Sequence, residues 1–203
     1  MDISRIVQSP LWYDKERDMH ISSLTLGERC KRPHRIIEMT GVIKKLQIEQ
    51  DDNLVIFVIP TDEKRNTERV TGNKIDLLYN FINDIQKYVD KIFFEWDTTA
   101  FGILSNQEIE TKKKTRRDII EKCDNDDMCI RINIPREINP QDKTSEYFTE
   151  IYNKNNKKIN MNRFNELCNK QFKGQITIAH VEFSKTGYQT ILLLNNLVLC
   201  DKL

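Results

Sequence analysis

Alanine, glycine and proline are scarce in this chain, and long apolar runs are missing. Alanine occurs only at Ala100 and Ala179, and there are 6 glycines and 5 prolines among 203 residues. No stretch approaches the roughly 18 consecutive apolar residues of a membrane-spanning helix. The first residues include Asp2 and Arg5 rather than the apolar segment of a secretory signal. We therefore expect neither a membrane span nor secretion.

An excess of charge of one sign is also missing. The chain has 32 basic and 31 acidic residues, for a formal net charge of +1. This balance excludes a uniformly basic nucleic-acid coat protein and an acidic tail protein. Any electrostatic function must come from local patches of charge.

The cysteines show no pattern typical of a secreted disulfide scaffold. There are five, an odd number, at Cys30, Cys123, Cys129, Cys168 and Cys200. Together with the lack of a signal, their spacing favours reduced thiols and an intracellular protein. The cytoplasm and the nucleus both remain open.

Alternating apolar residues predict a largely antiparallel sheet. Residues 36–48, with a bend or bulge at Gly41, and residues 54–59, closed by Pro60, form a predicted hairpin. Further strands are predicted at 91–104, 129–134, 175–183 and 188–194, with an interruption at Asn195-Asn196 before the chain resumes strand character.

Helical spacing predicts two or three helices. The apolar residues of 74–90 recur every three or four positions, which is typical of an amphipathic helix. Asn139-Pro140 is a helix-start signal before Tyr147, Phe148, Ile151 and Tyr152. A second short helix is expected over 161–168.

This order of elements favours one α+β domain over residues 1–203. We expect a mostly antiparallel, OB-like β-barrel core with two or three helices. Residues 1–35 are expected to form an N-terminal arm. Residues 105–128, which contain the basic run 112–117, are expected to form a long loop.

Catalytic and metal-binding motifs are missing. There is no phosphate-binding glycine loop, no His-Glu-x-x-His and no Gly-x-Ser-x-Gly, and the cysteines and histidines do not form two compact zinc-binding pairs. The sequence therefore predicts no enzyme, no cofactor and no metal.

Basic and aromatic residues in strand-rich segments predict a groove for single-stranded nucleic acid. Charge would hold the phosphates, and aromatic rings would stack on bases of any sequence. The expected phosphate contacts are Lys112, Lys113, Lys114, Arg116, Arg117, Arg131, Lys185, Lys44, Lys45 and Arg35, and the expected stacking residues are Trp96, Phe101 and Tyr188.

Each of these features has a second interpretation. Aromatic residues on strands are commonly core residues, and a basic run is commonly a solvated loop. The run 112–117 also fits a nuclear-localisation signal.

The C-terminal 75 or so residues show a family pattern. The predicted strand Cys129–Ile134 is followed by Pro135 and a predicted helix. A closing hairpin contains Ile176-Thr177, Phe183, Gly187 and Thr190-Ile191. This segment resembles the single-stranded DNA-binding proteins of poxviruses and related large DNA viruses. The resemblance implies an OB-like core, cooperative sequence-independent binding and a role in replication or recombination. Such proteins often end in an acidic tail, whereas this chain ends at Asp201-Lys202-Leu203.

The sequence therefore favours a viral single-stranded DNA-binding protein, with RNA left open. Self-association through 1–30 or 197–203, and contacts with replication proteins, are expected. The alternative is a viral protein–protein interaction module, such as a host-factor antagonist or virion component. A nuclease would need carboxylates gathered by the fold, for example Asp76, Glu95 and Asp97.

Overall fold

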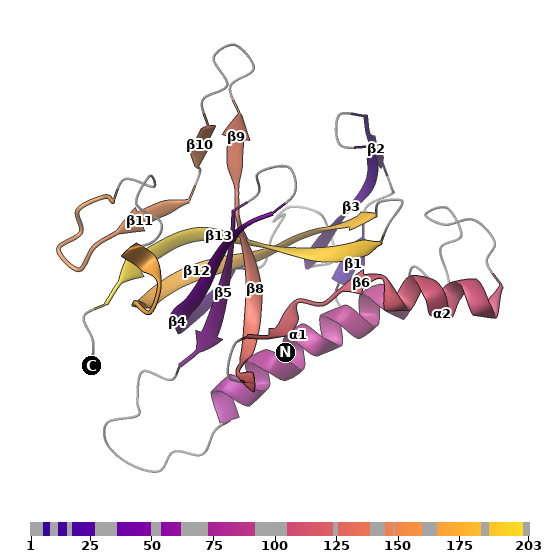
Figure 1. The fold of residues 1–203 in the computed structure, drawn as a ribbon, viewed down its shortest axis with the longest axis horizontal. Coiled ribbons are helices and arrows are strands. Elements are labelled where there is room, and N and C mark those ends of the chain that lie inside the picture. Colours follow the sequence, from indigo (N-terminus) through magenta and orange to yellow (C-terminus); the bar gives the residue numbers. More distant parts are fainter. Residues whose placement is uncertain are drawn as a thin grey trace. The chain divides into compact units, whose positions relative to one another are not determined.

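The chain folds into two compact units in a computed structural model (Figure 1). The structure describes residues 6–8, 12–15, 18–26, 36–49, 54–61, 73–91, 105–123, 126–138, 145–147, 149–159, 166–183 and 187–200. Unit 1 comprises Met1–Arg35, Leu78–Ile119 and Ile178–Ile191, and unit 2 comprises Ile36–Leu77, Ile120–Thr177 and Leu192–Leu203. Neither unit is one continuous stretch of chain, whereas the sequence predicted a single domain.

Unit 2 contains a closed five-stranded barrel. Its strands are β4 (Ile36–Ile48), β5 (Leu54–Pro60), β8 (Met128–Ile134) and the parts of β12 (Gln171–Phe183) and β13 (Tyr188–Leu199) that belong to this unit. β4 pairs antiparallel with β12 and β5, and β5 pairs antiparallel with β8. A parallel contact of β8 with β13 and a β12–β13 pairing close the ring. The predicted α+β, OB-like barrel is confirmed.

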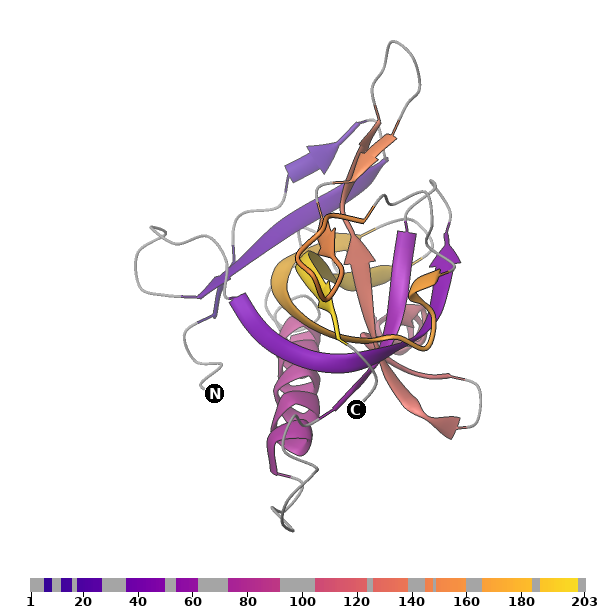
Figure 2. The same cartoon turned by 90° about the vertical axis from the view of Figure 1, so that its left-hand side faces the viewer.

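Apolar side chains at alternate positions of the strands fill the interior of the barrel. Ile43 lies opposite Val58, and Val58 lies opposite Ile130, and all three side chains are fully buried. A Cβ at Gly41 would lie 2.6 Å from a methyl carbon of Val58, so the close approach of β4 and β5 requires glycine there. The bend predicted at Gly41 lies farther along, since the register shifts between Ile43 and Lys45. In Figure 2, β4 is the long purple strand that curves around the barrel.

Unit 1 combines a sheet with two helices. β1 (Ile6–Gln8) and β2 (Trp12–Asp14) pair with β3 (Met19–Leu26), and β3 pairs with the end of β12. β6 (Arg116–Arg117) pairs parallel with the start of β13. Helix α1 (Asn73–Lys91) begins in unit 2 and buries Phe81, Ile82, Ile85 and Val89 in unit 1, which confirms the predicted helix.

The expected loop over 105–128 is wrong. Residues Asn106–Lys114 form helix α2, and β6 and β7 (Ile120–Lys122) follow. Ser105 provides the physical reason for the helix, since its side chain accepts a hydrogen bond from the backbone N–H of Glu108, while the Glu108 carboxylate accepts one from the Ser105 backbone N–H. This capping box begins α2 without help from a buried face.

The expected helix leading to Tyr152 is also wrong. β10 (Ser145–Tyr147) pairs with β9 (Arg136–Ile138), and β11 (Glu150–Tyr152) pairs parallel with β13. Ile151 is fully buried there, and the Thr149 hydroxyl donates to the carbonyl of Leu194 at 2.5 Å. Tertiary pairing therefore overrides the helix-start signal. Of the second short helix, residues 166–167 form a single 3₁₀ turn, and 161–165 lie outside the described residues.

Asn195 and Asn196 do not interrupt the last strand. The amide of Asn195 donates to the Thr177 hydroxyl at 2.7 Å, and that of Asn196 donates to the Gln175 side chain at 2.9 Å. These bonds to β12 keep β13 continuous. The predicted strand over 91–104 lies outside the described residues.

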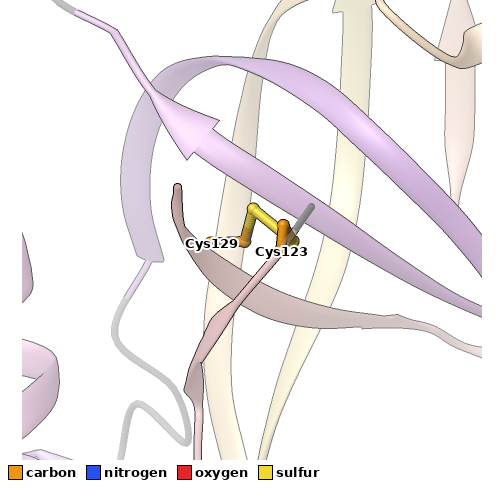
Figure 3. Close-up of a disulfide and its surroundings, with 2 residues drawn as sticks. All are labelled: Cys123 and Cys129. Atoms are coloured by element: carbon orange, nitrogen blue, oxygen red, sulfur yellow. A yellow bond between two sulfur atoms is a disulfide. The ribbon is translucent and has the colours of Figure 1, made fainter. Parts of the chain in front are cut away.

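Two cysteines form a disulfide, so the expectation that every thiol is reduced is wrong. Cys123, which follows β7, is bonded to Cys129 of β8 (Figure 3). β7 and β8 pair antiparallel, which brings the two Cα atoms to 6.0 Å. Cys129 is fully buried beside Val55 and Phe57. Cys168 and Cys200 are free thiols. In the described part of the chain, no helix is long and apolar enough to span a membrane.

Candidate nucleic-acid interface

Four exposed lysines gather on the outer surface of the barrel around the bulge of β4. We call Lys44, Lys45, Lys170 and Lys173 the lysine patch. Lys173 lies opposite Thr40 on the outward side of β12 and β4, since the neighbouring Phe172 and Met39 are buried. The carbonyl of Lys170 accepts a hydrogen bond from the backbone N–H of Ile43 at 3.1 Å, which places Lys170 beside the bulge.

The bulge explains why two consecutive residues of β4 are both exposed. Lys44 is the extra residue between the rows in which Ile43 opposes Val58 and Lys45 opposes Phe57. Residues that alternate in a regular strand would point to opposite faces, and a bulge breaks that alternation. Neither lysine has a carboxylate partner among the described residues. Lys45 instead places its ammonium nitrogen 5.5 Å from the ring centroid of Phe57.

Arg131 shares the outer row with Lys45 and Phe57, but it is not an open phosphate contact. Its side chain is 3% exposed, and its Nη2 lies 2.6 Å from Oε2 of Glu49. Because a buried guanidinium needs a counter-charge, the pair satisfies both ions inside the protein. The prediction that Arg131 contacts phosphate is corrected on this ground.

The neighbouring outward side chains of the barrel are covered as well. OB folds bind oligonucleotides on the face of their second and third strands, which here are β5 and β8. On that face Val55, Phe57 and Cys129 are buried. The accessible positive charge therefore lies on β4 and at the start of β12. Glu38, opposite Gln175, is an exposed carboxylate on the same side of β4, nearer its other end.

A second group of basic residues lies in unit 1. Lys112, Lys113 and Lys114 form the last turn of α2, a helix with no buried residue. Lys113 lies 3.5 Å from Glu110, and Lys114 is exposed. Lysines at a helix C-terminus also compensate the helix dipole, so their position alone does not establish binding.

Arg116, which is half-buried, and Tyr188, which is buried, belong to one network of ion pairs and hydrogen bonds. The guanidinium of Arg116 pairs with one oxygen of Asp90 and lies 2.6 Å from Asp118, while the Tyr188 hydroxyl donates to the other oxygen of Asp90 at 2.7 Å. Tyr188 is 2% exposed, and its ring stacks on Phe183 with centroids 5.8 Å apart. The expectation that Tyr188 stacks on a base is therefore corrected. The phosphate contact of Arg116 stays a prediction, and two carboxylates already pair with this side chain.

Burial and charge shift the pKa values within this network. Burial, followed by the hydrogen bond to Asp90 and the charge of Asp90, raises the pKa of Tyr188 well above its usual value. Burial by itself lowers the pKa of Arg116, but the hydrogen bond that Arg116 donates to Asp118 and the charges of Asp90 and Asp118 outweigh it and raise that pKa. Arg116 therefore stays charged and Tyr188 stays neutral.

The other predicted residues are divided between half-buried and undescribed positions. Arg117 is half-buried on β6 opposite Gln189. Trp96, Phe101, Lys185 and Arg35 lie outside the described residues. The structure places Lys44, Lys45 and Arg131 in unit 2, and Lys112, Lys113, Lys114, Arg116, Arg117 and Tyr188 in unit 1.

Sequence reasoning missed Lys170 and Lys173. The predicted strand began at residue 175, whereas β12 begins at Gln171. The polar–apolar alternation of Gln171, Phe172, Lys173 and Gly174 was a usable signal, because it continues the period of two. Extending the strand by that signal would have placed Lys173 on its outward face.

The described residues contain no group of three or more His, Cys, Asp or Glu side chains that could hold a metal ion. No family model matches the chain, and no curated protein matches it. The resemblance to viral single-stranded DNA-binding proteins thus stays a prediction.

Proposed function

We propose that this protein binds single-stranded DNA without sequence preference, through the lysine patch of its OB-like barrel. The carrying observation is the lysine patch itself, in which Lys44 and Lys45 have no carboxylate partner among the described residues. Such a protein acts without catalysis, in replication or recombination, and the resemblance to viral single-stranded DNA-binding proteins supports a viral role.

The patch fits a polyanion better than a single small anion. Lys173 and Lys44 lie about four residues apart along the strand direction, which is roughly 13 Å at the rise of an extended strand. A nucleic-acid backbone presents successive phosphates over such a distance. Lysines that neutralise phosphates release counterions, so binding weakens as salt rises.

Helix α2 supplies further phosphate contacts in this proposal. Lys114 is exposed and has no carboxylate partner in the described part of the chain. Arg131 and Tyr188 are left out because they are buried, and Arg116 is left out because it is paired with two carboxylates.

The test measures anisotropy of a labelled dT30 oligonucleotide at several salt concentrations. The variant Lys44→Gln/Lys45→Gln/Lys170→Gln should weaken binding and reduce the slope of log K against log salt by about 2, at roughly 0.7 for each lost contact with a single strand. A separate Lys112→Gln/Lys113→Gln/Lys114→Gln variant reports on α2. Duplex DNA and RNA serve as competitors.

Lys154→Gln/Lys157→Gln/Lys158→Gln is the charge-matched control, because these three lysines are exposed in the turn after β11. It should leave the slope unchanged. Absence of binding by the wild type at low salt and micromolar concentration would overturn the proposal. An unchanged slope in the patch variant would remove the lysine patch from the site.

A further inference from the structure

Two aromatic side chains of unit 1 are open to solvent on the β2–β3 hairpin. Trp12 is 51% exposed and Tyr13 is 47% exposed. Within the described residues of unit 1, these are the exposed large hydrophobic side chains. Each ring therefore presents an accessible aromatic surface to a ligand.

Strand pairing fixes the backbone that presents both rings. Trp12 lies opposite Ile21, and Tyr13 lies opposite His20 on β3. Ile21 is 4% exposed, and β3 is hydrogen-bonded on its other side to β12. β2 is thus an outer strand of the sheet, and β3 connects it to β12.

Tyr13 is fixed by two further contacts. Its hydroxyl donates to a carboxylate oxygen of Asp18, and its ring centroid lies 5.1 Å from that of His20. About half of the side chain still faces solvent. A ring that is already ordered loses little conformational entropy when a flat ligand stacks on it.

The arrangement suits flat aromatic ligands better than a protein surface. Successive residues of a strand point to opposite faces, so Trp12 and Tyr13 do not form one apolar patch. Asp14, Lys15 and Asp18, on or beside the hairpin strands, are polar. A protein interface would need a contiguous apolar core, whereas a nucleobase needs only the face of one ring.

We propose that the β2–β3 hairpin is a base-stacking site for single-stranded DNA, with an unstacked base on the indole of Trp12 and another on the ring of Tyr13. This inference rests on the proposed function and adds the part of the ligand that the lysine patch does not recognise. The acidic residues on the hairpin offset the charge of Lys15. The contribution of the hairpin to DNA affinity therefore comes from stacking and not from charge.

The test compares dT30 with an abasic oligonucleotide of the same length, which keeps the phosphates and lacks the bases. Trp12→Ala should weaken binding of dT30 about 5- to 150-fold, as expected for one lost stacking contact. The slope of log K against log salt should stay as in the wild type. Binding of the abasic strand should not change.

Fluorescence provides the second readout. Stacking on Trp12 should quench indole emission when dT30 is added. Trp12→Phe should keep most of the affinity, because it keeps a ring, and should lose the part of the quenching that comes from Trp12 and not from Trp96, the other tryptophan of the chain. Met128→Ala, which removes an exposed apolar side chain of unit 2, is the matched control and should behave as the wild type.

The outcomes separate this inference from the proposed function. If Trp12→Ala and the wild type bind dT30 equally while the patch variant binds weakly, the stacking site is wrong and the function stands. If the wild type does not bind dT30 at all, the proposed function fails. If Trp12→Ala weakens binding of the abasic strand, relative to the wild type, as much as it weakens binding of dT30, with the Met128→Ala control intact, the loss is structural and the stacking site is overturned.

Discussion

Burial decides what each basic residue can do. Arg131 and Arg116 have the same formal charge as Lys44 and Lys45, but Arg131 is buried against Glu49, and the half-buried Arg116 is paired with Asp90 and Asp118. The planar guanidinium can bind both oxygens of a carboxylate, whereas the compact ammonium of lysine favours water. The lysines are consequently the residues that remain available to a ligand.

Tyr188 provides a prediction at this scale. Its pKa is raised in the folded protein, while in the unfolded chain it ionises near pH 10. The folded state therefore holds a proton that the unfolded state loses above pH 10, so this contribution to stability is present below pH 10 and declines as pH rises. Tyr188→Phe should make the alkaline decline shallower by up to about 1.4 kcal/mol per pH unit.

Urea unfolding between pH 8 and pH 11.5 checks this. Tyr79→Phe, a substitution of a half-buried tyrosine on α1, is the control. Equal alkaline slopes for the wild type and Tyr188→Phe would mean that the phenol of Tyr188 ionises at its ordinary pKa, contrary to the contact with Asp90.

At the scale of elements, α2 shows that a helix can be specified by its ends. No residue of α2 is buried, so tertiary packing contributes little to it. The capping box of Ser105 and Glu108 begins the helix, and the lysines of the last turn compensate its dipole. The same three lysines thus have a structural role besides the proposed contact with phosphate.

Ser105→Ala should lower the free energy of local unfolding of α2 by about 1 kcal/mol, which is typical of a lost N-cap. Hydrogen exchange of the α2 amides should become faster, while the global free energy of unfolding changes by less than about 0.5 kcal/mol. The hydrogen bonds from Ser105 also lower the pKa of Glu108. The cap is therefore complete above the ordinary pKa of glutamate, and α2 should fray as pH falls from there through the lowered pKa of Glu108.

Thr111→Ala is the comparison within the same helix, because the Thr111 hydroxyl donates to the Gln107 carbonyl within the helix rather than to an N-terminal N–H. Equal exchange rates in α2 for Ser105→Ala and the wild type would show that the cap does not hold the helix.

For the molecule as a whole, the disulfide closes a loop between residues six positions apart. Closing a loop that short lowers the entropy of the unfolded chain, which stabilises the folded state by about 2 kcal/mol. Cys123→Ser/Cys129→Ser should therefore lower the free energy of unfolding of the non-reduced protein by about that amount. Reductant should bring the wild type to the same value.

Urea unfolding with and without reductant measures this effect, and peptide mapping of the non-reduced protein locates the cross-link. Cys168→Ser is the control, because Cys168 is a free thiol. Should the wild type be equally stable with and without reductant, the bond would not contribute to the folded state.

The sequence by itself determined the strands and the helix whose apolar spacing repeats over many residues. β4, β8 and α1 were predictable because their apolar residues recur with a period of two or about 3.6, and β5 was predictable because it is a short apolar, β-branched run bounded by turn residues. The OB-like α+β class followed from the order of these segments.

Only the tertiary structure decided which predicted contacts are open. Ile151 lies in a strand because its segment pairs with β13. Arg131 pairs with Glu49, which is 82 positions away in the sequence. Lys170 and Lys173 joined Lys44 and Lys45 because β12 lies beside β4. Exposure and charge pairing depend on neighbours that are distant in the chain. A local pattern of residue types contains no information about those neighbours.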